Sequence, residues 1–189
     1  MKRIMMLPIV AMALVFAQQA ECLAKDGGKE KTVMVGGAPM YPSKNIVENA
    51  VNSKDHTTLV AAVKAAGLVE TLQGDGPFTV FAPVNSAFDM LPKGAVDNLL
   101  KPENKAQLTG VLTYHVVPGN LDAAELMKWT KKGGGKTKLT TVQGGELWVM
   151  YDGKYLWLQD AQGGKAKVTI KDVHQKNGVI HVIDHVLMP

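Results

Sequence analysis

Residues 133–137 have the composition of a phosphate-binding loop, but not its full pattern. Gly133-Gly134-Gly135-Lys136-Thr137 resembles the end of such a loop, in which backbone amides and a lysine hold phosphate groups. A complete loop carries another glycine five residues before Gly135, and this chain has Thr130 there. It also follows a strand, whereas the apolar residues of 121–129 recur at helical spacing. The sequence therefore predicts a surface loop and no nucleotide site.

His181 and His185 are four residues apart, which is a common spacing for two metal ligands on a helix. The residues around them, 179–186, are rich in β-branched side chains and predict a strand. Four residues of a strand span about 13 Å, whereas a zinc–nitrogen bond is about 2 Å long. One ion cannot contact both side chains at that separation, so we expect no metal site from this pair.

The sequence contains none of the common motifs of hydrolytic or nucleophilic catalysis. It has no Gly-x-Ser-x-Gly turn and no His-Glu-x-x-His helix. Cys22 is the single cysteine, and the Asp and Glu residues are scattered without an evident pair. We therefore predict that the protein is not an enzyme, with no catalytic residue, no metal and no cofactor.

The N-terminus has the pattern of a cleavable signal peptide over residues 1–24. Lys2 and Arg3 precede an apolar run of 14 residues from Ile4 to Ala17, and small residues follow as far as Ala24. A membrane span needs about 20 apolar residues, so the run is too short for an anchor. The expected mature protein has no cysteine and no membrane span, and is secreted or periplasmic.

Cleavage after Ala24 would leave only a weak positive charge. It removes two basic residues and one acidic residue, Glu21, so the formal net charge falls from +4 to +3. No basic cluster stands out along the remaining sequence, and we therefore expect no nucleic-acid partner.

The elements that position these residues change in kind along the chain. Residues 25–40 are rich in Gly and Lys without a period, which predicts a flexible leader. Up to residue 129, short apolar segments at helical spacing dominate, broken by glycine and proline. From residue 131 onward, segments of strand-forming residues alternate with glycine turns. Helices followed by antiparallel strands indicate a single α+β domain over residues 41–189.

Three segments carry a more specific pattern: residues 76–88 (GPFTVFAPVNSAF), 112–119 (LTYHVVPG) and 177–189 (NGVIHVIDHVLMP). In order and spacing they resemble the first conserved motif, the Tyr-His motif and the second conserved motif of the fasciclin domain family. The resemblance covers residues 45–189. It implies a wedge-shaped fold, a two-sheet β-sandwich with helices packed on one side.

The resemblance also implies a function, namely adhesion or protein recognition without a catalytic centre. The expected partner is a surface or matrix protein or a polysaccharide. The Tyr-His segment contacts ligands in some family members, which makes Tyr114 and His115 candidate binding residues. Their apolar neighbours favour the alternative that both are buried and structural. The chain lacks an Arg-Gly-Asp tripeptide and an Asn-x-Ser/Thr sequon after residue 24, which argues against integrin binding and N-glycosylation.

A predicted hairpin supplies a second set of candidate residues. Asp152-Gly153 is typical of a two-residue turn, and in that register Trp148 lies opposite Trp157. Strand alternation then separates an aliphatic face from an aromatic face made of Trp148, Met150, Tyr155 and Trp157. A sandwich sheet buries one face, so the aliphatic face is expected in the core.

The aromatic face has two possible roles. It is either covered by helices or by the leader, or it is a binding patch. As a patch it would serve adhesion or, alternatively, the carriage of a small apolar or aromatic ligand. A large enclosed pocket would favour the carrier, and a flat exposed patch would favour adhesion.

Overall fold

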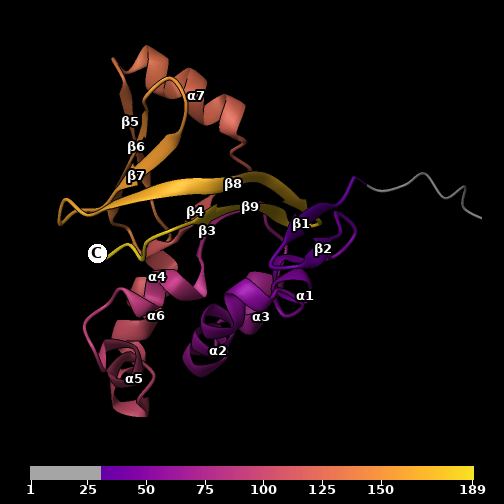
Figure 1. Cartoon of the computed structure of the whole chain (residues 1–189), viewed down its shortest axis with the longest axis vertical. Coiled ribbons are helices and arrows are strands. Elements are labelled where there is room, and N and C mark those ends of the chain that lie inside the picture. The colour runs from indigo at the N-terminus through magenta and orange to yellow at the C-terminus, as the bar shows by residue number, and fades with distance from the viewer. Residues whose placement is uncertain (1–30) are drawn as a thin grey trace, which may run out of the picture.

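The computed structural model describes residues 31–189, and the predicted signal peptide lies outside them. Figure 1 shows helices α1–α6 gathered on one side of the strands, with α7 beside β5–β7 at the far end. The α-helices are α1 (Ile46–Ala50), α2 (Thr57–Ala66), α3 (Val69–Gln73), α4 (Asn85–Asp89), α5 (Ala95–Leu99), α6 (Lys105–Tyr114) and α7 (Ala123–Lys132). Two 3-10 turns are η1 (Lys54–His56) and η2 (Pro102–Asn104). The strands are β1 (Val33–Val35), β2 (Ala38–Met40), β3 (Phe78–Pro83), β4 (Val116–Pro118), β5 (Lys136–Thr140), β6 (Glu146–Tyr151), β7 (Leu156–Gln159), β8 (Lys165–Gln175) and β9 (Gly178–Ile183).

Seven strands form one mixed sheet in the order β4-β3-β9-β8-β7-β6-β5. β3 and β9 pair in parallel, and the other neighbours pair antiparallel. β8 is 11 residues long, and its first part pairs with β7 while its remainder pairs with β9. The two end strands approach each other, since the Val142 amide donates to the Val116 carbonyl at 2.8 Å. The sheet is therefore nearly closed.

The α+β class is confirmed, but the predicted two-sheet sandwich is not the arrangement found. The register between β8 and β9 shifts twice, between Val168 and Ile170 and again between Ile170 and Val173. Such bulges bend a strand and increase its twist. Because β8 is bent there, one continuous sheet folds over itself and needs no second, separate sheet.

The central strands are buried on both faces, which divides the core in two. Val80 and Ala82 of β3 face the helices, whereas Phe81 between them faces the interior of the folded sheet. β9 is buried at all six positions, as a strand covered on both sides should be. α7 closes the second core by packing Leu126 against the aliphatic side of β5–β7.

The N-terminal hairpin β1–β2 differs from the expectation for the described part of the predicted leader, residues 31–40, whereas residues 25–30 lie outside the described residues. Instead of a flexible leader, residues 33–40 pair as strands, and Val35 and Met40 are each only 3% exposed. Gly36 and Gly37 both have positive φ, which glycine adopts without strain in so tight a turn. Two three-residue strands are too short to show a period in the sequence, and their order comes from packing on the helical core.

The two methionines of this region give a matched test of that packing. Met40→Ala is expected to lower the free energy of unfolding by about 2–5 kcal/mol, as for other buried methionines. Met34 lies on β1 and is 57% exposed, so Met34→Ala should change it by less than about 0.5 kcal/mol. Urea unfolding of both variants measures the difference, and equal midpoints would contradict the assigned role of the hairpin.

Candidate functional site

Tyr114 is fully buried at the end of α6, where its hydroxyl joins two loops of the sheet. The hydroxyl donates to the Glu146 carbonyl at 2.6 Å and accepts from the Ala161 amide at 3.1 Å. Burial raises the pKa of Tyr114, so the phenol stays protonated and keeps this donor. The side chain therefore anchors the start of β6 and the β7–β8 turn to the helical half of the domain.

His115 is equally internal, at 3% exposure, and both ring nitrogens have backbone partners. Nδ1 lies 2.8 Å from the Val111 carbonyl, which can only accept, so Nδ1 carries the proton. Nε2 accepts from the Leu187 amide at 3.0 Å. Burial lowers the pKa of His115 to about 4. A second proton, on Nε2, would point at the Leu187 amide hydrogen and remove the hydrogen bond that this amide donates. The geometry thus supports the structural role for Tyr114 and His115 rather than contact with a partner.

His181 repeats this arrangement with the other tautomer. Its ring is fully buried, Nε2 donates to the Leu121 carbonyl at 2.8 Å, and Nδ1 accepts from the Asp172 amide at 3.3 Å. Burial lowers the pKa of His181. His185 instead lies at the surface, 2.8 Å from Asp184. Within residues 31–189 no three His, Cys, Asp or Glu side chains cluster in a way that could hold a metal ion.

The β6–β7 hairpin forms, but its register differs from the predicted one by two residues. Trp157 lies opposite Met150, and Trp148 lies opposite Gln159, so the predicted Trp148–Trp157 pair is wrong. The connection has four residues, 152–155, because Tyr151 pairs with Leu156. A shift of two keeps every side chain on its predicted face, since sides alternate with a period of two.

The aromatic side of this hairpin is the outer face of the folded sheet. The opposite, aliphatic side belongs to the core: Leu147, Val149 and Leu158 are fully buried, and α7 packs there. Trp148, Met150, Tyr155 and Trp157 are half-buried. These four residues form the centre of a surface that we call the outer face. It also includes the side chains that flank them, namely Lys136, Lys138, Glu146, Asp152, Lys154, Gln159, Lys165 and Lys167.

Lysines flank the outer face on both sides. The Lys136 ammonium lies 4.7 Å from the centre of the Trp148 ring. The Lys167 ammonium lies 3.4 Å from the centre of the Tyr155 ring. Cations at these distances are attracted by the negative face of an aromatic ring. Flexible, charged side chains therefore partly cover the rings of Trp148 and Tyr155.

The hairpin tip is held rigid by Asp152. Its carboxylate accepts from the Lys154 amide at 2.8 Å, the Tyr155 amide at 2.7 Å and the Trp157 Nε1 at 2.8 Å. These hydrogen bonds, to Tyr155 foremost, lower the pKa of Asp152 to about 2. The third bond fixes the orientation of the Trp157 indole. Next to it lies a shallow hollow of about 310 Å³, lined by Met150, Tyr151, Asp152, Trp157 and Lys165.

The flanking lysines were not predicted from the sequence to be part of this face, because they lie on strands far apart in the chain. Lys136 and Lys138 are on β5, and Lys165 and Lys167 are on β8, with the hairpin between them. A signal was present, since both pairs have the Lys-x-Lys spacing that puts two side chains on one face of a strand. The sequence alone did not show that both pairs share a face with the tryptophans.

The fasciclin domain family matches residues 54–189. The chain belongs to this family. Protein sll1483 of Synechocystis sp. is 46% identical over 164 residues, which are 85% of this chain and 82% of that protein. Immunogenic protein MPB70 of Mycobacterium bovis is 36% identical over 74% of this chain and 66% of its own length. Human periostin is 31% identical over 71% of this chain, which matches only 15% of periostin.

A solved structure supports the fasciclin fold. A FAS1 domain pair from the insect cell adhesion molecule fasciclin I has a TM-score of 0.55, with 22% identity, over 69% of this chain and 43% of that one. Fasciclin domains are generally non-catalytic and are associated with adhesion and with binding of surface or matrix proteins. In this fasciclin domain, no helix within residues 31–189 has the length and apolar character to cross a membrane.

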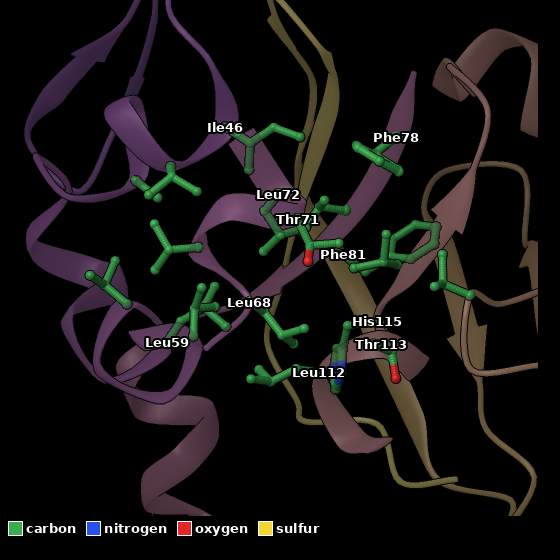
Figure 2. A pocket seen from close by; sticks show the side chains of 18 of the residues that line it. Ile46, Leu59, Leu68, Thr71, Leu72, Phe78, Phe81, Leu112, Thr113 and His115 are labelled. Carbon is green, nitrogen blue, oxygen red and sulfur yellow. The ribbon is translucent and has the colours of Figure 1, made fainter. Parts of the chain in front are cut away.

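The fasciclin domain also contains an apolar pocket between its helices and its central strands. Figure 2 shows Ile46, Leu59, Leu68, Leu72 and Leu112 from the helical side around the pocket, together with Phe78 of β3. His115 also lines this pocket. Its volume is about 70 Å³, well below the roughly 300–1,000 Å³ of typical ligand pockets. The pocket in this conformation therefore suits only a very small apolar molecule.

Proposed function

We propose that this fasciclin domain is an exported, non-catalytic binding module for adhesion or molecular recognition, and that its outer face makes the contact. The observation that carries the proposal is the outer face itself. Two tryptophans, a tyrosine and a methionine lie together on one strand surface, opposite the packed side of the same strands. Tryptophan and tyrosine are the residues most often found at the energetic centre of interfaces.

The rigidity of the hairpin tip supports a binding role. Binding loses free energy when flexible side chains become ordered, by about 0.5–1.5 kcal/mol for each immobilised side chain. The Asp152 hydrogen bonds already order the Trp157 indole before any partner arrives. Export is proposed from the signal-peptide pattern of residues 1–24 and agrees with a partner on a surface or in a matrix.

The proposal predicts that Trp148→Thr with Trp157→Thr abolishes partner binding and leaves the fold intact. Threonine suits strands, and neither ring fills the core. Removal of an interface tryptophan typically costs about 2 kcal/mol or more, so the double variant should bind at least about 100-fold more weakly. Binding of the mature protein to envelope fragments from the producing cells, measured by co-sedimentation, gives the readout.

The matched control changes apolar residues that are exposed elsewhere. Met34→Thr with Met90→Thr, at 57% and 55% exposure, should leave binding unchanged. A collapsed fold of the tryptophan variant in a thermal melt would make the outer face a core layer. A folded variant with full binding would place the contact elsewhere. Either result overturns the proposal.

Carriage of a small apolar ligand is the second candidate function, and the pocket of Figure 2 is the observation that favours it. An engineered apolar cavity of about 150 Å³ in another protein binds benzene, so the present pocket of about 70 Å³ would have to double in volume to hold such a ring. Benzene should then raise the melting temperature of the wild type increasingly as its concentration rises above its Kd. It should not do so for Val63→Phe, whose ring would fill the pocket. The same rise in both proteins would exclude the pocket as the site.

A further inference from the structure

We propose that the outer face binds an acidic polysaccharide, with its aromatic centre against the sugar rings and its lysines against the acid groups. This inference rests on the proposed function and names the class of partner for the same face. It comes from an arrangement that neither the family motifs nor the hairpin pattern contains.

The strand registers place the lysines symmetrically around the aromatic centre. One row across the sheet reads Lys136, Met150, Trp157, Lys167, and the next reads Lys138, Trp148, Gln159, Lys165. Neighbouring strands are about 4.8 Å apart, so the lysine backbones at the two ends of a row are roughly 14 Å apart. Each row therefore has a cation at both ends and two uncharged, mostly apolar side chains between them.

The two carboxylates on this face, those of Glu146 and Asp152, already have partners within it. Glu146 lies 2.7 Å from Lys138 and is neutralised by it. Asp152 uses its carboxylate for hydrogen bonds within the hairpin tip. Lys136, Lys154, Lys165 and Lys167 make no ion pair with a carboxylate among residues 31–189. The outer face thus presents a positive field around its aromatic centre.

An acidic polysaccharide complements both features. A pyranose ring presents a face of C–H groups, which carries slight positive charge and stacks on the negative face of an aromatic ring. Carboxylate or sulfate groups along the chain would meet lysines, whose long stems let a point charge adjust to varied positions. The half-buried rings and the shallow hollow beside Trp157 suit a ligand that lies along a surface.

Two other anionic partners fit the face less well. Arginine is the residue that best recognises phosphates, guanine edges and protein carboxylates through paired hydrogen bonds. The chain has no arginine after Arg3, so all of its cations on this face are lysines. Lysine is also depleted in protein–protein interfaces, whereas arginine is enriched there. The lysine-only composition therefore favours a polysaccharide over a nucleic acid or an acidic protein surface.

The test compares polymers that differ only in charge. The probe is polygalacturonate, a carboxylated chain, and its fully methyl-esterified form is the neutral control. Isothermal titration at low salt should show binding of polygalacturonate and at least tenfold weaker binding of the ester. Raising the salt to 0.5 M should weaken binding further, because exposed charges are screened.

Two variants test the two halves of the face. Replacing Lys136, Lys138, Lys165 and Lys167 by glutamine should weaken polygalacturonate binding at least tenfold. The same change at Lys54, Lys64, Lys93 and Lys105, which are exposed on the helical side, removes equal charge and should have less than a twofold effect. Trp148→Thr with Trp157→Thr should also weaken binding tenfold or more. A thermal melt of each variant checks that it is folded.

Several results would overturn the inference. These are equal binding of the neutral polymer, equal effects of the two lysine sets, full binding by the tryptophan variant, or tighter binding of single-stranded DNA or polyglutamate. Failure here is distinct from failure of the proposed function. If the wild type binds envelope fragments through the outer face but not polygalacturonate, only the polysaccharide inference falls. If the face variants bind those fragments normally, the proposed function falls as well.

Discussion

Gly178→Ala is expected to destabilise the domain severely. Gly178 starts β9 with a φ of +156° and lies opposite Phe78 in the parallel β3–β9 pair. A methyl group there would overlap the carbonyl oxygen of Phe78. That oxygen is part of the backbone of a central strand, so it cannot move aside without breaking the pair. We expect a loss of about 4 kcal/mol or more, against a typical total stability of about 5–15 kcal/mol.

Gly110→Ala is the matched control for this prediction. Gly110 lies inside α6, and an added methyl group there would meet no atom within 4 Å. Alanine forms helices better than glycine, so this variant should be more stable than the wild type by about 0.5–1 kcal/mol. Circular dichroism and urea unfolding of both variants make the comparison. Wild-type stability in Gly178→Ala would mean that β3 and β9 are not this close.

Acidification from pH 7 to pH 5 is expected to destabilise the domain through His115. The ring has a pKa of about 4 in the folded state and about 6.5 in the unfolded chain, so only the unfolded state takes up a proton in this range. Uptake by the unfolded state favours unfolding. Stability is therefore complete above about pH 6.5 and is lost as the pH falls toward 4. From pH 7 to pH 5 the loss from His115 alone is about 2 kcal/mol.

The other buried histidines act in the same direction. Burial lowers the pKa of both His56 and His181, so each adds to the loss of stability as the pH falls. Urea unfolding at pH 7, 6 and 5 measures the combined effect of the three histidines on the free energy of unfolding. His115→Gln removes one titrating group, and its stability should depend less on pH than that of the wild type. A wild-type stability that is constant from pH 7 to pH 5 would contradict the neutral, buried state of these rings.

His115→Gln also tests the role of the Tyr-His segment. At pH 7 it should be less stable than the wild type by about 1–3 kcal/mol, since the Leu187 amide and the Val111 carbonyl lose their buried partner. Binding to envelope fragments should be unchanged while the variant is folded, because the ring does not reach the surface. Loss of binding with an unchanged melt would assign His115 to the contact instead.

The family motifs turn out to hold the fold together, and the proposed contact lies outside them. Asn177 shows this best. Its side chain accepts from the Ile46 amide at 3.1 Å and donates to the Leu72 carbonyl at 2.8 Å, which ties α1 and α3 to the start of β9. Asn85 begins α4, but its side chain does not cap that helix. It accepts instead from the Thr58 amide at 3.1 Å, at the start of α2. Such roles depend on which segments meet in space, and local sequence patterns do not carry that information.

Properties that depend on local patterns could be predicted from the sequence. Helical spacing, glycine turns and β-branched runs predicted an α+β domain with the β6–β7 hairpin, and the three motifs predicted the fasciclin family. Strand alternation separated the aliphatic and aromatic sides of the hairpin. That division survived the error in register, because a shift of two residues leaves every side chain on its side.

Properties that depend on contacts between distant segments could be established only from the folded structure. The bulges of β8 fold one sheet over itself, and the helical core orders residues 33–40, whose strands are too short to be predicted alone. Burial in two packed layers places Tyr114 and His115 inside the domain. The pairing of β5 with β6 and of β7 with β8 brings Lys136 and Lys167 to the same aromatic side chains. The sequence contains each of these side chains, but the sheet's register places them together.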